Sequence, residues 1–266
     1  MLANTRQNEI CKIIKEKSAV TTAMLSEKFG VSVETIRKDL LFLEKRGELV
    51  RVHGGAITKP SAVSYQSFNE RVDSFREQKS EVGKIAAEFV KNGDTIAIDA
   101  GSTAIEFIDA LKERLDTLTV VTYSMDVFER ARDYKNFNVI LCGGFFMKSE
   151  NTFYGEFALE MLDKIHVGKS FVFPSGISLS NGLCDCLPQF VDMQRKLISV
   201  CDRVFVVADS SKYEKCSLIK SAETSPRYIY ITDSKIPAEI TEIYKGNGIT
   251  LVTSAKQAKT IRAEEN

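Results

Sequence analysis

The sequence predicts a small helical domain joined to a larger α/β domain that has a mainly parallel sheet. Three observations support this fold class for the 266 residues. Residues 6–56 carry three short helical patterns followed by a hairpin pattern. Residues 58–66 contain a proline and several small polar residues, as linkers do. From residue 67 onward, continuous apolar strands alternate with amphipathic helices, which is typical of a parallel sheet covered on both faces.

The predicted boundaries are residues 1–57 for the head, 58–66 for the linker and 67–266 for the larger domain. The linker is short, so we expect the two domains to be mechanically coupled. Charge is distributed unevenly between them, although the net charge of the chain is zero. Residues 1–60 carry eleven basic and seven acidic residues, whereas the remainder carries 25 and 29. A basic head on an acidic body suits contact with a polyanion.

Neither membrane insertion nor disulfide bonding is expected. No apolar run approaches the roughly 20 residues that a membrane-spanning helix needs. Residues 1–10 are polar and lack the apolar core of a signal peptide, so a cytoplasmic location is expected. The six cysteines are irregularly spaced and form no Cys-x-x-Cys pair, the nearest approach being Cys184-x-Cys186. This spacing favours unpaired thiols over disulfides or a metal site.

The head begins with an expected helix over residues 6–17, which places isoleucines on one face and charges around the rest. A short second helix is expected over residues 23–29, with an N-cap at Thr21-Thr22. The apolar residues that this second helix should bury are Met24, Leu25 and Phe29. Residues 30–32 then make a tight turn.

A third helix begins at the N-cap candidate Ser32 and should be about four turns long. Its apolar residues follow +3, +4, +3 spacing and predict one buried stripe formed by Val33, Ile36, Leu40 and Leu43. Gly47 ends this helix, and residues 49–53 indicate a strand closed by a Gly54-Gly55 turn. Asp39 would be repelled by phosphate, so we expect it to pair with a basic neighbour inside the head.

This order of helix, helix, turn, helix and hairpin indicates a winged helix-turn-helix that binds double-stranded DNA. Ser32 and Thr35 stand at a helix N-terminus, where contact with backbone phosphate is expected. Arg37 and Lys38 face away from the buried stripe and are candidates for base or phosphate contact. The wing supplies two further candidates, Arg51 and His53, although a structural role stays open for His53. The candidate DNA-binding residues are Ser32, Thr35, Arg37, Lys38, Arg51 and His53.

The larger domain should alternate between helices and strands to the end of the chain. A long helix is expected over residues 68–90, with an apolar stripe that includes Val72 and Phe75. The further expected helices are residues 104–114, 125–133, 157–165, 189–201 and 237–246. The expected strands are residues 94–99, 118–122, 138–142, 169–173, 203–208, 228–231 and 249–252, followed by a charged tail.

Ligands of such sheets bind at the carboxyl ends of the strands, and polar residues gather there. Glycine allows close approach, hydroxyls donate hydrogen bonds, and a helix N-terminus offers N–H groups to an anion. No G-x-G-x-x-G or Walker pattern is present, so a phosphorylated small molecule fits better than a dinucleotide, and no cofactor is expected. The candidate ligand-binding residues are Asp99, Gly101, Ser102, Thr103, Thr122, Ser124, Gly143, Gly144, Arg195, Asp209 and Lys212.

Several of these segments resemble one known family. Residues 35–40 (TIRKDL) and 51–56 (RVHGGA), within a near-continuous match from Arg6 to Ala56, are similar to the DNA-binding head of the DeoR family of bacterial transcription repressors. Residues 99–103 and 208–212 resemble that family's effector domain. The resemblance spans residues 5 to about 255. Tyr123 stands where the family commonly has Asn, Gln194 where it commonly has Lys, and residues 183–187 follow no family pattern.

The resemblance implies an effector domain similar in fold to ribose-5-phosphate isomerase, with phosphorylated sugars as usual ligands. It further implies a repressor of a carbohydrate-utilisation operon whose operator affinity is modulated by such a sugar. A homodimer or higher homo-oligomer is expected, because two heads reading two half-sites make one short helix per subunit sufficient.

Two other functions stay open at this stage. An isomerase carrying a DNA-binding head would need a general base, for which Asp99, Asp185 and Asp209 are candidates. A redox or metal sensor would use Cys184 and Cys186. The spacing shows no acid–base pairing and no metal motif, so we expect neither enzyme activity nor a metal site.

Overall fold

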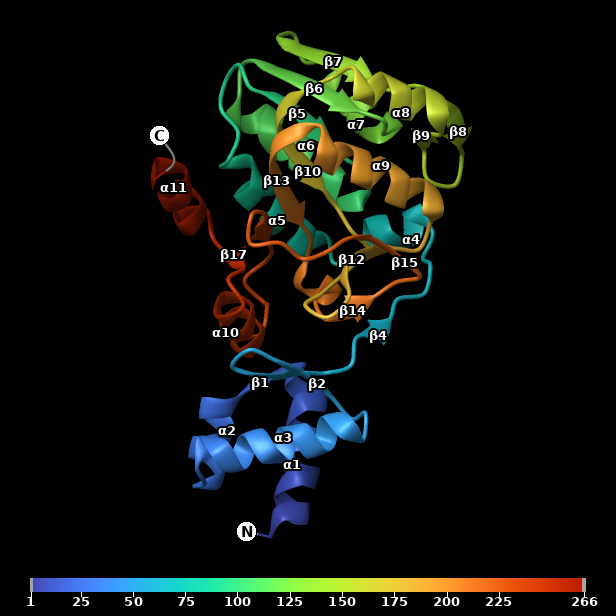
Figure 1. Cartoon of the computed structure of the whole chain (residues 1–266). Helices are drawn as coiled ribbons and strands as arrows, with labels where there is room; N and C mark the ends of the chain where they lie inside the picture. The colour runs from blue at the N-terminus through green and yellow to red at the C-terminus, as the bar shows by residue number, and fades with distance from the viewer. Residues whose placement is uncertain (1, 265–266) are drawn as a thin grey trace.

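The computed structural model describes residues 2–264 and has two parts, a small head and a larger α/β domain (Figure 1). The elements of the head are α1 (Ala3–Lys17), β1 (Ala19–Thr21), α2 (Thr22–Phe29), α3 (Val33–Lys45), β2 (Val50–Val52) and β3 (Gly55–Ile57). The strands form one antiparallel sheet in the order β1-β3-β2. The winged helix-turn-helix prediction is therefore confirmed. Strand β1, which was not predicted, lies between α1 and α2 in the chain and pairs with β3 of the wing.

The third helix forms where its cap and apolar spacing place it. The Ser32 hydroxyl accepts a hydrogen bond from the Thr35 backbone N–H at 3.2 Å and so caps α3. Ile36, Leu40 and Leu43 are buried in the head core. Val33 was expected in the same stripe, but it is 37% exposed. It is the first residue of α3, and Val31, within the preceding turn, packs against the head core instead.

A buried ion pair joins the first and third helices. Arg6 Nε donates to Asp39 Oδ2 at 2.6 Å, and Gln7 Nε2 donates to Asp39 Oδ1 at 2.8 Å. Both charged side chains are less than a tenth exposed. The expected pairing of Asp39 is therefore confirmed. Removing one partner of such a pair leaves a buried charge without compensation.

The larger domain is built on a seven-stranded sheet in which all neighbouring strands run parallel. The strands, in spatial order, are β17 (Thr250–Val252), β16 (Ile229–Ile231), β13 (Cys201–Val207), β10 (Val167–Val172), β5 (Thr95–Ile98), β6 (Leu118–Thr122) and β7 (Phe137–Leu141). The predicted parallel sheet is confirmed, and five of its strands are buried over most of their length: β16, β13, β10, β5 and β6.

Helices cover both faces of this sheet and create two cores. One core includes residues of α5 (Arg76–Ala87), α6 (Ser102–Arg114), α7 (Met125–Ala131) and α11 (Ala255–Glu264). The other includes residues of α8 (Glu156–Asp163), α9 (Pro188–Ser199) and α10 (Ala238–Gly246). None of the described helices is both long enough and apolar enough to cross a membrane.

The expected long helix over residues 68–90 is wrong, because the chain breaks it into α4 (Phe68–Asp73) and α5. Phe75 adopts a left-handed backbone conformation with φ of 54° and is 50% exposed rather than buried. Val72 is only partly buried. The break has a local cause: the buried Lys79 ammonium donates to the carbonyls of Arg71 and Ser74, which a continuous helix would use internally.

Several short strands escape sequence prediction. They are β4 (Ser61–Ala62), β8 (Phe145–Met147), β9 (Thr152–Tyr154), β11 (Gly176–Ser178), β12 (Gly182–Asp185), β14 (Lys215–Cys216) and β15 (Ile219–Ala222). Each has two to four residues, too few to display a period of two. They form a β8–β9 ribbon, an antiparallel β11-β12-β15 sheet and a β4–β14 pair. The charged tail contains α11, a helix for which no prediction was made.

The segment expected to be a linker lies against the α/β domain. Strand β4 pairs in parallel with β14, and Val63 N–H donates to the Cys216 carbonyl at 2.7 Å. The predicted domain boundaries stay predictions, but residues 61–63 are held by backbone hydrogen bonds rather than free. Mechanical coupling between the two domains therefore has a physical basis.

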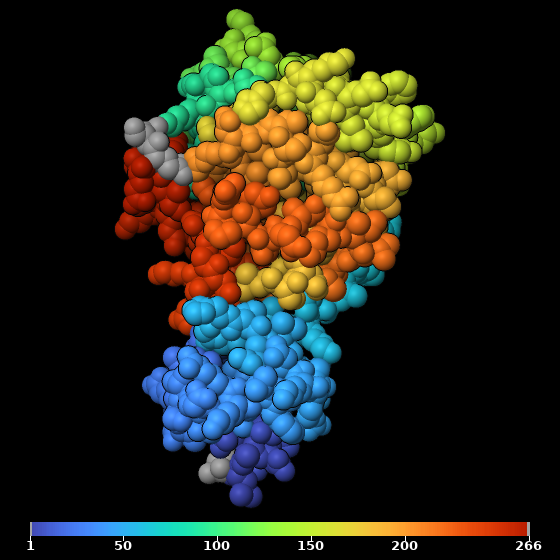
Figure 2. Space-filling view, viewed as in Figure 1, coloured from blue at the N-terminus to red at the C-terminus, as the bar shows by residue number. Residues whose placement is uncertain are grey.

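The head also docks directly on α10, as Figures 1 and 2 show. Lys17 Nζ forms an ion pair with Glu239 at 2.5 Å. Asn247 Nδ2 donates to the His53 carbonyl at 3.3 Å. Ala19 and Ile57 of the head belong to the same apolar core as residues of α10. A movement of α10 would consequently displace the head.

We predict that Arg6→Ala lowers the free energy of unfolding of the head by about 3 kcal/mol, because it strands the buried Asp39 carboxylate. Hydrogen exchange of the α1 and α3 backbone amides measures this loss. Lys12→Ala is the matched control, since its ion pair with Glu9 spans 3.6 Å on the exposed surface of α1 and should contribute little. Equal protection in both variants would contradict the role given to Arg6.

Candidate DNA-binding surface and ligand cavity

The exposed side of α3 carries four of the predicted DNA-binding residues. The Ser32 hydroxyl is engaged in the N-cap and lies 2.9 Å from the Thr35 hydroxyl. Arg37 and Lys38 are exposed. Among residues 2–264, Arg37 pairs only with Glu34, in a surface ion pair of 3.7 Å that a phosphate could replace at small cost.

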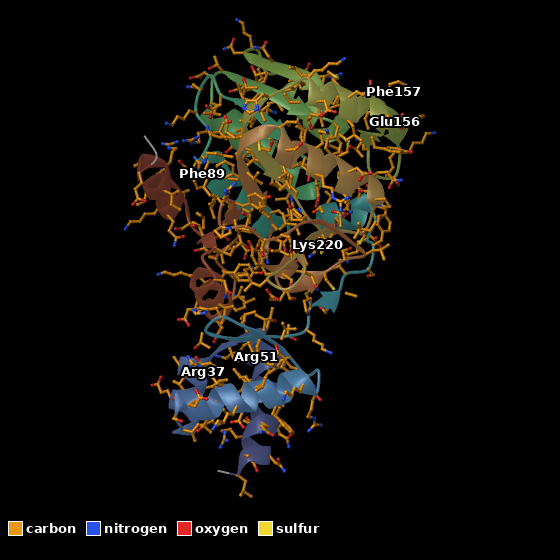
Figure 3. The ribbon with its side chains drawn as sticks, viewed as in Figure 1. Arg37, Arg51, Phe89, Glu156, Phe157 and Lys220 are labelled. Atoms are coloured by element: carbon orange, nitrogen blue, oxygen red, sulfur yellow. The ribbon has the colours of Figure 1, made fainter. Side chains whose placement is uncertain are left out.

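The other two candidates lie on the wing, across a groove from α3. The groove is lined by Thr22, Arg37, Leu40, Arg51, Val52, His53, Gly54 and Gly55. Arg37 from α3 and Arg51 from β2 thus lie on the two sides of one groove (Figure 3). Arg51 is oriented by Glu44, which accepts a hydrogen bond from its backbone N–H at 2.9 Å. The groove offers two guanidinium groups to a DNA backbone.

His53 serves the structure through its backbone and leaves its ring exposed. Its carbonyl accepts the hydrogen bond from Asn247, which belongs to the contact between head and α/β domain. A DNA contact and a structural role, the two functions that the sequence left open for His53, are therefore both compatible with its position. Its contact with DNA stays a prediction.

A second candidate site is a cavity in the α/β domain, at the ends of the central strands β5, β10 and β13. It opens to solvent, and the space available to the centres of water molecules inside it is about 40 Å³. The lining residues are Gln66, Arg71, Ser74, Phe75, Lys79, Ala100, Gly101, Ser102, Thr103, Phe173, Pro174, Ser175, Asp185, Phe190, Val207, Ala208, Asp209 and Lys212. The break between α4 and α5 thus places residues of both helices on the cavity wall.

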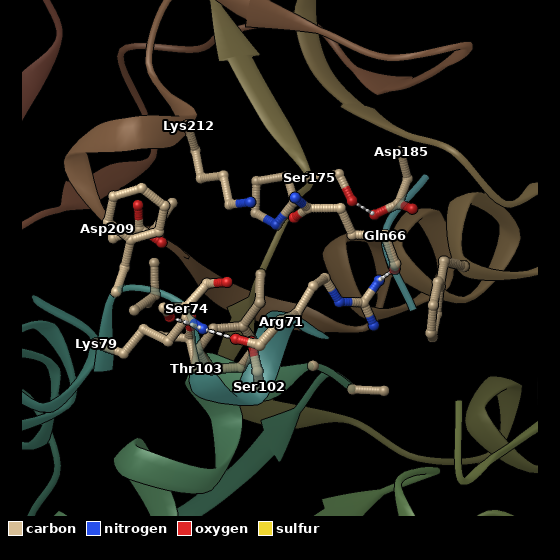
Figure 4. Close-up of a pocket in the computed structure, with 18 residues that line it drawn as sticks. Gln66, Arg71, Ser74, Lys79, Ser102, Thr103, Ser175, Asp185, Asp209 and Lys212 are labelled. Carbon is tan, nitrogen blue, oxygen red and sulfur yellow. Dashed lines mark hydrogen bonds between the residues drawn. The ribbon is translucent and has the colours of Figure 1, made fainter. Parts of the chain in front are cut away.

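One part of the cavity wall is suited to an anion. Helix α6 begins there after Gly101, whose φ of 144° favours glycine, and it presents the Ser102 and Thr103 hydroxyls with its N-terminal N–H groups. Figure 4 shows Arg71 and Lys212 extending into the same space. Arg71 is held in place by an ion pair with Glu150, whose side chain is fully buried. A phosphate group is the ligand that such a set of donors would recognise.

Lys79 adds a third cation beneath this wall. Burial lowers the pKa of its ammonium to about 8, with the nearby Asp209 carboxylate opposing that effect. Its Nζ is already bonded to the carbonyls of Arg71 and Ser74. Lys79 therefore positions the segment that carries Arg71.

Carboxylates line another part of the cavity. Asp185 accepts hydrogen bonds from Ser175 Oγ at 3.0 Å and from the Cys186 N–H at 2.7 Å, and burial raises the pKa of its carboxyl group. Asp209 is 1% exposed, and its Oδ2 has no hydrogen-bond partner among residues 2–264. A buried carboxylate oxygen without a partner is costly, and a ligand hydroxyl would satisfy it.

Five of the predicted ligand-binding residues line this cavity: Gly101, Ser102, Thr103, Asp209 and Lys212. The structure places the other six outside it. Asp99 lies beneath the wall, fully buried, and accepts hydrogen bonds from the Phe173 and Ala100 N–H groups and from the Tyr123 hydroxyl. Burial raises the pKa of Asp99 to about 7. Tyr123, where the family commonly has Asn, thus serves this buried carboxylate.

The remaining corrections concern strands β6 and β7 and helix α9. Thr122 donates to the Ile98 carbonyl at 2.8 Å, and Ser124 caps α7. Gly143 and Gly144 lead into the β8–β9 ribbon rather than into the cavity. Arg195 lies on the outer side of α9 and donates to the carbonyls of Ser221 and Lys220. The end of β6 is covered by the β8–β9 ribbon, whose Phe153 N–H and Thr152 hydroxyl donate to the Tyr123 carbonyl.

Sequence reasoning missed the cavity residues contributed by α4 and α5 and by the small antiparallel sheet. Arg71 and Lys79 lie in a segment with many other charged residues, so their charge alone did not single them out. Ser175 closely follows the expected strand over residues 169–173, which was an available signal, and Asp185 was considered only as a candidate general base. Gln66 gave no signal. Cys184 is buried on β12, and Cys186 Sγ lies 2.8 Å from the Ser217 hydroxyl. All six cysteines are free thiols, and residues 2–264 contain no cluster suited to a metal ion.

The fold and its two sites define a class of protein: a winged helix-turn-helix reader joined to a small-molecule sensor. The chain belongs to the DeoR family of transcriptional regulators. A DeoR-like helix-turn-helix domain model matches residues 6–61, and a DeoR C terminal sensor domain model matches residues 74–234. We refer to the α/β domain as the sensor domain from here on.

Similar proteins agree with this family. The chain is 33% identical over 241 residues to YulB of Bacillus subtilis strain 168, named as an uncharacterised HTH-type transcriptional regulator, covering 90% of this chain and 93% of that protein. It is 30% identical to the transcriptional repressor AccR of Agrobacterium fabrum strain C58, over 86% of this chain and 89% of that one. Ribose 5-phosphate isomerase A of Methanocaldococcus jannaschii shows 21% identity and a TM-score of 0.39, covering 53% of this chain and 55% of that one.

We predict that Arg37→Ala weakens binding to operator DNA by roughly 1–3 kcal/mol, because one side of the groove loses its guanidinium. Titration of labelled operator at several salt concentrations measures the affinity, and the salt slope should fall by about one phosphate contact. Arg132→Ala, which removes an equal charge from the exposed end of α7, is the control. Unchanged affinity in the Arg37 variant would contradict the proposal that α3 contacts operator DNA.

Proposed function

We propose that this regulator represses a carbohydrate-utilisation operon and that a phosphorylated sugar in the sensor cavity changes its affinity for operator DNA. One observation carries the proposal: anion donors and buried carboxylates line the same cavity. The N-terminus of α6, Arg71 and Lys212 suit a phosphate. Asp185 and Asp209 suit the hydroxyl groups of a sugar. The relative named as a transcriptional repressor supports the repressor role.

Regulation requires a physical connection between cavity and head, and one segment supplies it. We call residues 209–217 the connecting segment. It starts in the cavity with Asp209 and Lys212. It ends in β14, which pairs with the linker strand β4, and Lys215 Nζ donates to the Ser61 hydroxyl at 2.7 Å. A ligand that displaces Lys212 therefore acts on a segment bonded to the linker.

The middle of the connecting segment contacts the helix on which the head docks. Glu214 is buried and accepts a hydrogen bond from the Tyr244 hydroxyl of α10 at 2.8 Å. Tyr213 packs edge-on against the Tyr244 ring at 5.5 Å. Burial raises the pKa of the Glu214 carboxyl group to about 7. The connecting segment thus reaches the head by two routes, through β4 and through α10.

Ligand contacts in the cavity can supply the coupling free energy that regulation requires. A ligand that releases DNA must bind the released state more tightly than the DNA-bound state. A hundredfold effect on operator affinity needs about 2.7 kcal/mol of coupling, and charged hydrogen bonds contribute about 1.5–3 kcal/mol each. One or two ligand contacts made only in the released state would suffice.

We predict that the double substitution Ser102→Ala with Lys212→Ala weakens effector binding at least hundredfold and leaves operator binding intact, because it removes phosphate donors far from the head. A thermal-shift screen against pentose and hexose phosphates identifies the effector, and operator titration with and without it measures the response. Arg195→Ala is the control, since this cation lies outside the cavity. A normal response to effector in the double variant would contradict the proposal that the effector binds in the cavity. Turnover of a sugar phosphate would favour an enzyme instead.

We further predict that Tyr244→Phe retains effector affinity and basal operator affinity but reduces the effector's influence on operator affinity. The variant removes only the hydroxyl that bonds Glu214. The ratio of operator Kd values with and without effector is the decisive measurement, because a loss of stability alone would not change it. Tyr228→Phe is the matched control, as its partly buried ring touches Tyr230 rather than the connecting segment. Equal ratios in both variants would contradict the route through α10.

A further inference from the structure

Aromatic side chains gather on the surface of the sensor domain where the β8–β9 ribbon meets α8. Phe145, Phe146 and Phe157 are 59%, 44% and 66% exposed, although phenylalanine is normally buried. With the adjoining Phe153 and Tyr154 they form what we call the aromatic patch. Figures 1 and 3 place it at the end of the sensor domain remote from the head. Neither the DNA surface nor the cavity uses it.

The patch has aromatic rings on both faces of the ribbon. Phe145 lies 5.9 Å from Tyr154 and 6.3 Å from Phe157 between ring centroids. Phe146, the next residue along the strand, points to the other face and lies 5.2 Å from Phe153. A two-stranded ribbon with three residues per strand gains little stability of its own in water. An exposed apolar surface on such a ribbon indicates a contact with another molecule.

The ribbon is fixed in place before any partner binds. Phe153 N–H donates to the Tyr123 carbonyl at 2.8 Å, and the Thr152 hydroxyl donates to the same carbonyl at 2.9 Å. A Cβ at Gly144 would lie 2.5 Å from the Tyr154 carbonyl oxygen, so glycine permits the tight fold. A surface ordered in advance loses little conformational entropy on association.

We propose that the aromatic patch is the surface through which two copies of this chain associate. Aromatic side chains bury about 150–250 Å² each, so the three exposed phenylalanines leave roughly 300 Å² uncovered. A stable interface needs roughly 800 Å² per partner. The neighbouring edge strand β7, with Val139, Ile140 and Leu141 only partly buried, can supply much of the difference.

The charges around the patch favour a second copy over an unrelated partner. Lys148 stands at the tip of the ribbon, whereas Glu156 and Glu160 stand at its base on α8. All three are exposed, and the described chain forms no ion pair with them. A two-fold axis places the same surface against itself. In the proposed dimer the axis is placed so that Lys148 of one copy faces Glu156 of the other, and by symmetry this contact then occurs twice.

Association through this patch leaves the DNA-binding surface accessible, because the patch is at the far end of the sensor domain from the head. The inference rests on the proposed function in one respect: two heads held together would read two half-sites of an operator. The association itself is measured without DNA or effector. Failure of this inference is therefore distinct from failure of the proposed function.

The test is the molar mass of the full chain in solution, by sedimentation or light scattering over a dilution series. The natural chain should have the mass of a dimer, and Phe145→Glu with Phe157→Glu should have the mass of a monomer. Leu218→Glu is the matched control, because Leu218 is 81% exposed but lies outside the patch, and it should leave the dimer intact. A monomeric natural chain, or a dimeric double variant, overturns the proposal.

Charge exchange provides a second measurement that does not disturb the apolar packing. Lys148→Glu and Glu156→Lys, each alone, should raise the dimer Kd about tenfold, because attraction becomes repulsion at two symmetric contacts. Both together should restore the natural Kd. If the phenylalanine variant fails to fold, as judged by circular dichroism, the Lys148→Glu and Glu156→Lys variants test whether the patch is the dimer interface. Additive effects without restoration would overturn the two-fold arrangement.

Discussion

The connecting segment of residues 209–217 is the part of the structure on which the relation between its two domains depends. It begins at the carboxyl end of β13, where the parallel sheet places its ligand site. It then buries Glu214 against Tyr244 and pairs with the linker through β14. Glu214 has a backbone φ of 51°, an unfavourable conformation for a non-glycine residue that its surroundings must maintain. Cavity, α10 and linker are consequently parts of one bonded unit.

The cavity carries more buried charge than a purely structural core would tolerate. Lys79, Asp185 and Asp209 are all nearly buried. Burial opposes the charged form of Lys79 and of Asp185, as the shifts in their pKa values show. The unbonded Oδ2 of Asp209 adds a further cost. Ligand-binding sites commonly retain such costs, because groups left partly unsatisfied in the free protein are those that a ligand satisfies.

The head and the aromatic patch lie toward opposite ends of the molecule (Figure 1). This order suits a regulator in which one end reads DNA and the other joins two copies. A single short helix touches few base pairs, so a winged helix-turn-helix gains specificity when a second head is held beside it. The sensor domain would then carry both the regulatory ligand and the contact between subunits.

Much of this protein follows from its sequence, for local reasons. The caps and apolar spacing determined α3, and continuous apolar runs determined the central strands of the sheet. Gly101, Ser102, Thr103, Asp209 and Lys212 follow strands directly, which is why the sequence could propose them. That these residues reach the cavity while Thr122 and Gly143 do not was decided by the place of each strand in the sheet. Only the tertiary structure decided the break at Phe75, the docking on α10 and the entry of Arg71 and Asp185 into the cavity. These features depend on contacts between residues far apart in the chain, such as Arg71 with Glu150 or Glu214 with Tyr244, and such contacts leave no periodic pattern in the sequence.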